Sequence, residues 1–132
     1  MASVFTRIAN REIPAHIVAE SDEFLAFLDI SPLVEGHTLV IPKKEVDYLF
    51  DLDDETLAGL NIFAKKVARA IDSVSDCERV GVSVIGLEVP HAHVHLIPIN
   101  SVDDMNFSRM KLSPSKEELQ ETAKRINAAF QS

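Results

Sequence analysis

Residues 91–97, His-Ala-His-Val-His-Leu-Ile, alternate between histidine and apolar side chains until the final apolar pair. Side chains two positions apart share one face of a strand but scatter around a helix. The alternation therefore predicts a strand over residues 92–99. In that strand Ala92, Val94 and Leu96 face the core, and the three histidines line the opposite face.

Proline and glycine divide the remaining chain into short segments. Four of these are rich in Val, Ile, Leu and Phe and have the length of strands, at residues 16–20, 24–30, 37–41 and 79–85. A helix of about five turns is predicted after the acidic run 51–55, because apolar residues recur at helical spacing at Leu57, Leu60, Ala64, Val67 and Ile71. A closing helix is predicted over about residues 113–130, with Pro114 at its first position.

This order of elements predicts an α+β fold, and 132 residues suit a single domain over residues 1–132. The connection at residues 87–90, between the last two strands, is too short for a parallel crossover. We therefore expect those two strands to pair antiparallel.

Composition restricts the classes of partner. A net charge of −8 offers no basic stripe for a nucleic acid polymer, although a small anion held by backbone N–H groups and histidines is compatible with it. The single cysteine, Cys77, excludes an internal disulfide framework and a zinc site built on several cysteines. Because no apolar run has the length of a signal peptide or membrane span, we expect a cytoplasmic protein without a membrane partner.

The histidine cluster allows three interpretations. A lone histidine on an apolar strand is usually a packing residue, but three in register perturb one another's pKa values, which a structural role does not require. A metal site is the second interpretation, since neutral imidazole is a common zinc ligand; however, no HExxH, CxxC or companion carboxylate stands beside the cluster. The third is nucleophilic catalysis, in which one imidazole attacks phosphorus and another handles charge or a proton.

The triplet with its intervening apolar residues resembles the hallmark of the histidine-triad (HIT) nucleotide-binding family, His-φ-His-φ-His-φ-φ with φ apolar. The resemblance extends to Phe-Leu-Asp-Ile-Ser-Pro at residues 27–32 and to Gly-His-Thr-Leu-Val-Ile-Pro-Lys-Lys at residues 36–44. Over residues 4–97 it is nearly continuous, and it resembles bacterial HIT-like proteins in particular.

The resemblance implies a five-stranded antiparallel sheet with two helices, usually paired as a homodimer whose sheets join. It also implies catalytic roles for four histidines. His93 would attack the α-phosphorus of a nucleotide conjugate and form a nucleotidyl-histidine, and the His91 backbone carbonyl would orient the His93 ring. His95 would contact phosphate oxygens, and His37 would complete a hydrogen-bonded histidine network.

The same resemblance implies a purine nucleotide site. Asp29, with Ile30 beside it, would bind the ribose, since a carboxylate accepts hydrogen bonds from both vicinal hydroxyls. Taken alone, Asp29 suits a turn at a strand end equally well. The resemblance implies that four apolar residues hold the base, although apolar residues at these positions suit an ordinary core equally well. They are Val4, Phe5, Ile8 and Phe27.

The chain departs from the family in two places. Many members carry Gly-Gln-Ser just before the triad, where this chain has a shorter loop with Leu87 and Glu88, so phosphate contact would depend on the backbone N–H groups of Glu88 and Val89. Glu88 is alternatively a residue that positions a leaving amine, or a solvent-facing one. Some bacterial relatives bind zinc through two cysteines and a histidine where this chain has Ser3, Thr6 and Glu45. We therefore predict no bound metal.

The predicted function is hydrolysis at the α-phosphate of a purine nucleotide conjugate, such as an AMP phosphoramidate, without a cofactor. A dinucleoside polyphosphate hydrolase or phosphorylase, and a nucleotide-binding protein with little turnover, are the alternatives. Residues 100–112, including Phe107 and Arg109, follow the triad where family members diverge. They are expected to shape the choice of leaving group, or to form a plain surface loop or dimer contact.

Overall fold

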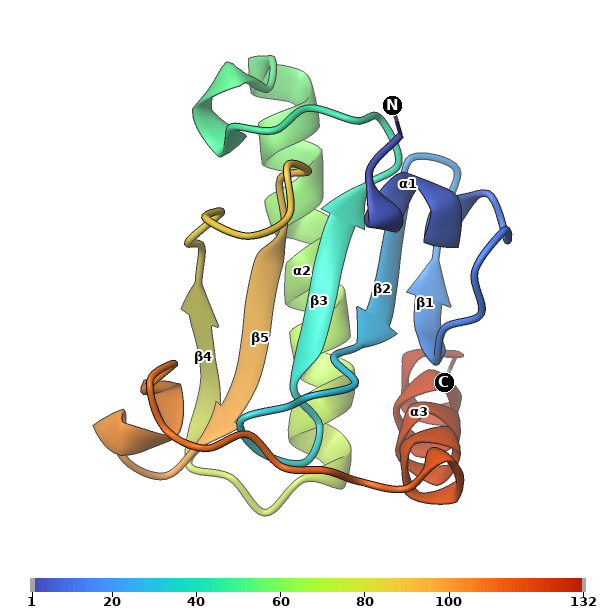
Figure 1. Ribbon diagram of the computed structural model, residues 1–132. Coiled ribbons are helices and arrows are strands. Elements are labelled where there is room, and N and C mark those ends of the chain that lie inside the picture. Colours follow the sequence, from blue (N-terminus) through green and yellow to red (C-terminus); the bar gives the residue numbers. More distant parts are fainter. Residues whose placement is uncertain (1, 132) are drawn as a thin grey trace.

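The computed structural model describes residues 2–131, so Met1 and Ser132, the two ends of the predicted domain, lie outside the described residues. Five strands and three α-helices make up most of the regular structure of these residues, together with two short 3-10 helices at Leu49–Asp51 and Val102–Met105 (Figure 1). In chain order these are α1 (Val4–Ala9), β1 (Ile17–Glu20), β2 (Phe24–Leu28), β3 (Thr38–Pro42), α2 (Asp54–Val74), β4 (Arg79–Ser83), β5 (Val94–Ile99) and α3 (Lys116–Gln131).

The five strands form one antiparallel sheet in the order β1-β2-β3-β5-β4. This confirms the predicted fold class and the antiparallel pairing of the last two strands. Every predicted strand is present, although each is shorter than expected at one or both ends or shifted by a residue. The differences reach two residues, at the ends of β2 and β4 and at the start of β5. β5 begins at Val94 because the N–H of Ala92 donates to the Val46 carbonyl in a loop (2.7 Å).

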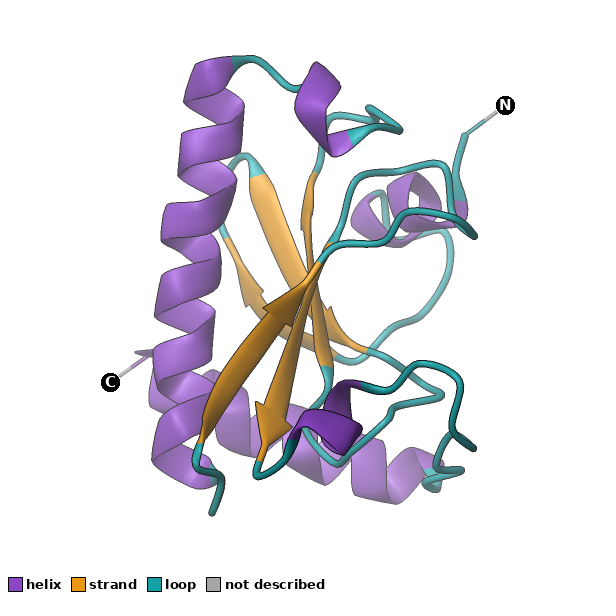
Figure 2. Ribbon diagram, turned by 90° about the vertical axis from the view of Figure 1, so that its left-hand side faces the viewer, coloured by secondary structure: helices purple, strands orange, loops and turns teal. Residues whose placement is uncertain are grey.

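Helix α2 covers one face of the sheet, as Figure 2 shows. Asp53 caps the helix by accepting from the N–H of Thr56 at 2.7 Å, and two acidic residues follow in the first turn. Gly59 allows the helix to approach the sheet closely, since a Cβ there would lie 2.9 Å from the Phe24 ring. The core beneath α2 includes Ala92, Val94 and Leu96, as the alternation predicted.

Helix α3 begins at Lys116, so the prediction that Pro114 occupies the first helical position is wrong. Ser115 and Glu118 form the start instead. The Ser115 hydroxyl accepts from the Glu118 N–H at 3.1 Å, and the Glu118 carboxylate accepts from the Ser115 N–H at 2.8 Å. This reciprocal pair satisfies two backbone N–H groups at the start of α3, where the first N–H groups of a helix have no partner within it.

The other face of the sheet carries a second, smaller apolar cluster. Several loop segments lie over this face (Figure 2). Helix α1 lies on this face and was not predicted. Its six residues are too few for a clear helical periodicity, and Ser3 caps them by accepting from the Thr6 N–H at 3.0 Å. Phe5 and Ile8 of α1 pack against Phe27 and Leu39 of the sheet.

Residues 101–112, here called the strap, fold back beside β4 and β5 towards the same face (Figure 1). Arg109 fixes the strap internally, because its guanidinium donates to Asp103 and Asp104 at 3.1 and 3.4 Å. The same guanidinium donates to the Leu33 carbonyl at 3.0 Å, which ties the strap to the chain between β2 and β3.

No helix among residues 2–131 is both long and apolar enough to cross a membrane.

Candidate active site

His91 is fully buried, and both of its ring nitrogens have partners. Nε2 lies 2.7 Å from the Pro42 carbonyl oxygen, which can only accept, so Nε2 carries the proton. Burial lowers the pKa of His91, which keeps the ring neutral and leaves Nδ1 as an acceptor. The Ser3 hydroxyl donates to that Nδ1 at 2.7 Å.

The His93 ring is also held in one orientation by a hydrogen bond to a backbone carbonyl. Its Nδ1 lies 2.7 Å from the His91 carbonyl oxygen and must donate to it, so in the neutral ring Nε2 holds the free lone pair. The Phe5 ring packs edge-on against the His93 ring, with centroids 5.0 Å apart. A fixed ring with an unprotonated Nε2 is the arrangement that a nitrogen nucleophile requires.

His37 and His95 form a buried pair. His37 Nδ1 accepts from the Leu33 N–H at 3.1 Å, so Nε2 carries the proton and donates to His95 Nδ1 at 2.9 Å. Burial, with repulsion between neighbouring rings, lowers the pKa of His37 to about 3 and that of His95 to about 4. Both rings are therefore neutral near pH 7, and His95 retains an Nε2–H as a donor.

The sequence placed all three triad histidines on one strand, and this expectation is wrong for His91 and His93. Only His95 lies in β5, while His91 and His93 precede it in an extended loop. All three are at most 8% exposed, because α1 and the strap cover them. The Phe107 ring of the strap lies edge-on to His95 and His37, with centroids 4.8 and 6.1 Å away.

A cavity of about 420 Å³ opens beside the triad and is here called the triad cavity. It is lined by Phe5, Phe27, Leu28, Asp29, Ile30, Leu39, Ile85, Gly86, Leu87, Glu88, Val89, His93, His95, Phe107 and Lys111. The lining therefore combines apolar side chains, two imidazoles and the loop that precedes the triad. Such a mixture of apolar walls and a few convergent polar groups is typical of a ligand site.

The structure brings together most of the predicted site residues in this cavity. Eight of them line it, namely Phe5, Phe27, Asp29, Ile30, Glu88, Val89, His93 and His95. His91 and His37 lie behind His93 and His95 and contact them by hydrogen bonds. Val4 and Ile8 do not line the cavity. Val4 is 41% exposed, and Ile8 belongs to the apolar cluster beneath α1.

Asp29 follows β2 at the rim of the triad cavity. One carboxylate oxygen accepts from the Ser31 N–H at 2.8 Å, so the turn role considered from sequence is present. The other oxygen lies 3.7 Å from His37 Nε2. Since His37 is neutral near pH 7, this contact carries little ion-pair character. Burial raises the pKa of Asp29 from its ordinary value, which favours a partner that supplies hydrogen-bond donors.

Sequence reasoning missed several lining residues. Leu39 is the cross-strand partner of Phe27, so a correct strand register would have placed it on the same face. Lys111 is the only Lys or Arg in the lining, and it reaches the cavity because its ammonium donates to the Phe107 and Arg109 carbonyls. No local sequence pattern signals a contact that depends on the path of the strap.

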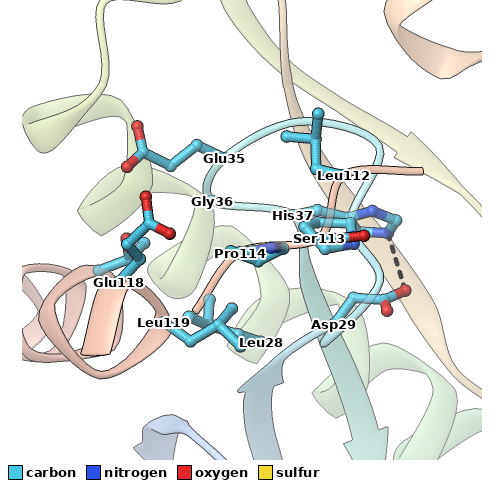
Figure 3. A pocket seen from close by; sticks show the side chains of 12 residues that line it. Leu28, Asp29, Glu35, Gly36, His37, Leu112, Ser113, Pro114, Glu118 and Leu119 are labelled. Carbon is cyan, nitrogen blue, oxygen red and sulfur yellow. Dashed lines mark ion pairs between the residues drawn. The ribbon is translucent and has the colours of Figure 1, made fainter. Parts of the chain in front are cut away.

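A second hollow of about 390 Å³ shares Leu28 and Asp29 with the triad cavity and is also lined by His37 (Figure 3). Glu35 and Glu118 stand at one end of it, and Asp29 and His37 at the other. Because three carboxylates line this hollow, it disfavours a phosphate. Of the two hollows, the triad cavity is therefore the better candidate for a nucleotide.

Two groups of residues offer atoms that metal ions bind. Within residues 2–131, Asp29, His37 and His95 offer ligand atoms within 4.8 Å of one another. However, a metal at His37 Nε2 would move the ring proton to Nδ1, which already accepts from the Leu33 N–H. The other group, Ser3, Thr6 and Glu45, supplies two hydroxyls and one exposed carboxylate that are hydrogen-bonded to one another. The second set lacks the thiolates and imidazoles that zinc prefers. The first set has atoms of a type that zinc accepts, but its His37 nitrogens are already committed to hydrogen bonds with Leu33 and His95.

Comparison with known proteins identifies the family. The sequence model of the HIT domain matches residues 10–102. The chain belongs to the HIT family. This HIT protein is 36% identical to an uncharacterized HIT-like protein of Borreliella burgdorferi over 132 residues, covering 94% of this chain and 95% of that protein.

Two further relatives of this HIT protein bear on its function and on metal binding. A Saccharomyces cerevisiae protein named adenosine 5'-monophosphoramidase is 39% identical over 99 residues, covering 74% of this chain and 62% of the yeast protein. A zinc-bound HIT family protein from Mycobacterium smegmatis has a similar structure, with a TM-score of 0.82 and 28% identity over 99% of this chain and 94% of that one. The resemblance to the HIT family seen in the sequence is thereby confirmed.

Proposed function

We propose that this HIT protein is a nucleotide hydrolase that cleaves AMP phosphoramidate-like conjugates at the α-phosphorus through a nucleotidyl-His93 intermediate. The observation that carries the proposal is the 2.7 Å hydrogen bond from His93 Nδ1 to the His91 carbonyl. It leaves the Nε2 lone pair of a cavity-lining histidine free to attack. The yeast relative named as a phosphoramidase supports the same reaction.

In the first step, His93 Nε2 forms a bond to the α-phosphorus while the bond to the leaving amine breaks. The amine leaves with the electron pair of that bond and takes up a proton from solvent. The His95 Nε2–H is a donor in the cavity and would stabilise charge on the phosphate oxygens. In the second step, water attacks the same phosphorus and loses a proton to solvent while the bond from phosphorus to His93 Nε2 breaks. AMP is released, and the electron pair of the broken bond returns His93 to its neutral form.

The other cavity residues are assigned by their chemistry. Phe5 and Phe27 lie edge to face with centroids 5.3 Å apart, and they would hold the base between apolar walls. The free oxygen of Asp29 would accept from the ribose hydroxyls. The backbone N–H groups of Glu88 and Val89 would donate to the α-phosphate, since this chain lacks the amide and hydroxyl that many family members place there.

A comparison of substrates tests the proposal. We expect AMP to be released from an AMP phosphoramidate faster than from a dinucleoside polyphosphate, as measured by chromatography of nucleotides over time. Preferential cleavage of the polyphosphate would reassign the substrate class and keep the nucleophile. If AMP raises the melting temperature while both conjugates stay intact, the protein is a nucleotide-binding protein with little turnover.

The sheet edge at β4 supports pairing with a second copy. β4 has β5 on one side only, and apolar side chains in and beside it are exposed, with Val82 at 61% and Val84 at 40%. Val82 lies opposite Leu96 of β5, so it projects from the face that α2 covers elsewhere. An exposed apolar edge strand is a template for pairing. The proposed assembly is therefore a homodimer joined at β4.

A charge at this edge is expected to separate the two copies. Val82→Lys places an ammonium within the apolar edge, so the mass in solution should fall from that of a dimer to the monomer mass of 14.6 kDa. Light scattering after size-exclusion chromatography measures this directly. Val102→Lys, at a strap position that is 89% exposed, is the matched control and should remain dimeric. A monomeric wild type, or a dimeric Val82→Lys variant, would contradict pairing at this edge.

A further inference from the structure

Four polar residues from three separate parts of the chain meet behind the triad. Ser3 and Thr6 come from the start of α1, Glu45 follows β3, and His91 precedes β5. The Glu45 Oε1 atom accepts from the Ser3 N–H at 2.7 Å and from the Thr6 hydroxyl at 2.6 Å. The Ser3 hydroxyl accepts from the Thr6 N–H and donates to His91 Nδ1 at 2.7 Å.

We propose that Ser3, Thr6 and Glu45 form a metal-free latch that positions the nucleophile His93 through His91 and α1. Ser3, Thr6 and Glu45 are thus positioning residues, and none of them lines the triad cavity. The inference rests on the proposed function only for its kinetic consequence. The coupling of these residues to the two rings is a structural claim that is tested separately.

The first route of coupling runs through His91. Its ring is held at both nitrogens, by the Pro42 carbonyl on one side and the Ser3 hydroxyl on the other. The backbone carbonyl of the same residue accepts from His93 Nδ1. If the Ser3 hydroxyl is removed, the buried Nδ1 of His91 loses its main donor, and the ring must shift or recruit Thr6, whose hydroxyl lies 3.3 Å away.

The second route runs through α1. The latch fixes the N-terminus of this six-residue helix, which is too short to be stable alone. Phe5, in its first turn, packs edge-on against both His91 and His93, with centroids 5.9 and 5.0 Å away. If α1 were displaced, the His93 ring would lose the packing of Phe5 on one side, and the His91 ring behind it would lose its contact with Phe5 as well.

In each hydrogen bond of the latch, the donor and the acceptor are fixed by the chemistry of the groups. The Ser3 N–H and then the Thr6 hydroxyl stabilise the Glu45 carboxylate and lower its pKa, so the carboxylate is ionised at neutral pH. The Thr6 hydroxyl donates its single proton to Glu45, so the Ser3 hydroxyl is the group that donates to His91. Each member therefore fixes the donor direction of the next.

Matched pairs of variants test the latch at Thr6 and Glu45. Thr6→Val removes the hydroxyl and keeps the shape, whereas Thr6→Ser keeps the hydroxyl. Glu45→Ala removes the acceptor, whereas Glu45→Gln keeps an oxygen that accepts from both donors. We expect Thr6→Val and Glu45→Ala to lower kcat for AMP phosphoramidate by about 10-fold to 100-fold with KM nearly unchanged, and the conservative partners to restore most of it. Arg7→Ala, on α1 but outside the latch, is the control.

The effect of Ser3→Ala is measured by NMR of the histidine rings. This measurement does not depend on turnover. The ¹⁵N shift of His91 Nδ1 is expected to change because its donor is lost, and the His93 ring signals are expected to change with it. Since Thr6 can take over the contact, the double variant Ser3→Ala with Thr6→Val should give the larger change. Should the Ser3 variants fail to fold, the pairs at Thr6 and Glu45 decide the question at less buried positions.

The outcomes separate the two proposals. An inactive wild type whose His91 and His93 signals still respond to Ser3→Ala would refute the hydrolase and keep the latch. The latch is overturned if the Ser3 variants leave the His93 signals unchanged, or if Thr6→Val and Thr6→Ser have the same kcat. It is also overturned if Arg7→Ala loses as much kcat as Glu45→Ala, because the effect would then belong to α1 in general.

Discussion

Replacing His93 with alanine is expected to lower kcat for release of AMP from an AMP phosphoramidate by about 10⁴-fold or more. The variant removes the only cavity-lining nitrogen whose lone pair the hydrogen-bond pattern leaves free. Binding of AMP should persist, since Asp29, Phe5 and Phe27 are unchanged. Steady-state kinetics, with AMP binding measured by calorimetry, give both quantities.

His16→Ala is the matched control for this variant, because it removes a histidine that does not line the triad cavity. Its kcat should stay within about twofold of the wild-type value. A His93→Ala protein that retained kcat within tenfold of wild type would place the nucleophile elsewhere in the molecule.

The buried histidines predict a steep loss of stability at mildly acidic pH. In the folded protein the pKa of His37 is lowered to about 3 and that of His95 to about 4, whereas in the unfolded chain both return to about 6.5. Between these limits the unfolded state binds more protons. The free energy of unfolding therefore falls as pH is lowered from about 6.5 towards 4.

The slope of this dependence is large for a small protein. Each imidazole that is neutral when folded and protonated when unfolded contributes up to about 1.4 kcal/mol per pH unit, so the pair contributes about 2–3 kcal/mol per unit. His91, whose pKa is also lowered by burial, acts in the same direction. Asp29 opposes it, because an acid whose pKa is raised on folding contributes stability that is lost as pH rises.

Urea unfolding at several pH values between 5 and 7 measures the slope. His37→Gln removes one titrating ring, so its slope should be smaller than that of wild type even if its stability is lower at every pH. A free energy of unfolding that stays constant from pH 6.5 to 5 would show that the histidine pair is not held neutral by burial.

The sequence predicted the sheet well because strand signals are local. The alternation of Ala92, Val94 and Leu96 with histidine placed these apolar residues correctly in the core, even though β5 begins two residues later than expected. Strand ends were less predictable, since they depend on which carbonyl receives each N–H. The Ala92 N–H donates to Val46, a residue almost fifty positions away, and no local pattern indicates that partner.

The sequence predicted the residues of the candidate site better than it predicted their burial and neighbours. Family resemblance supplied His37, His93 and Asp29, and the structure places all three in or directly behind the triad cavity. The burial of the histidines was not predictable, because Phe107 reaches them from the strap and Phe5 from a helix too short to leave a periodic signal. Ser3 and Thr6 stood out only as absent zinc ligands, because their contacts with His91 join residues 88 and 85 positions apart in the sequence.

The covalent intermediate on His93 is the central claim, and mass spectrometry of the intact protein tests it most directly. Wild type and His93→Ala are each mixed briefly with an AMP phosphoramidate and analysed without acid, because a bond between phosphorus and imidazole is acid-labile. The account predicts an adenylyl adduct on wild type, located at His93 by peptide analysis, and no adduct on the variant. Release of AMP by wild type with no adduct at any mixing time, or an adduct on another residue, would contradict it.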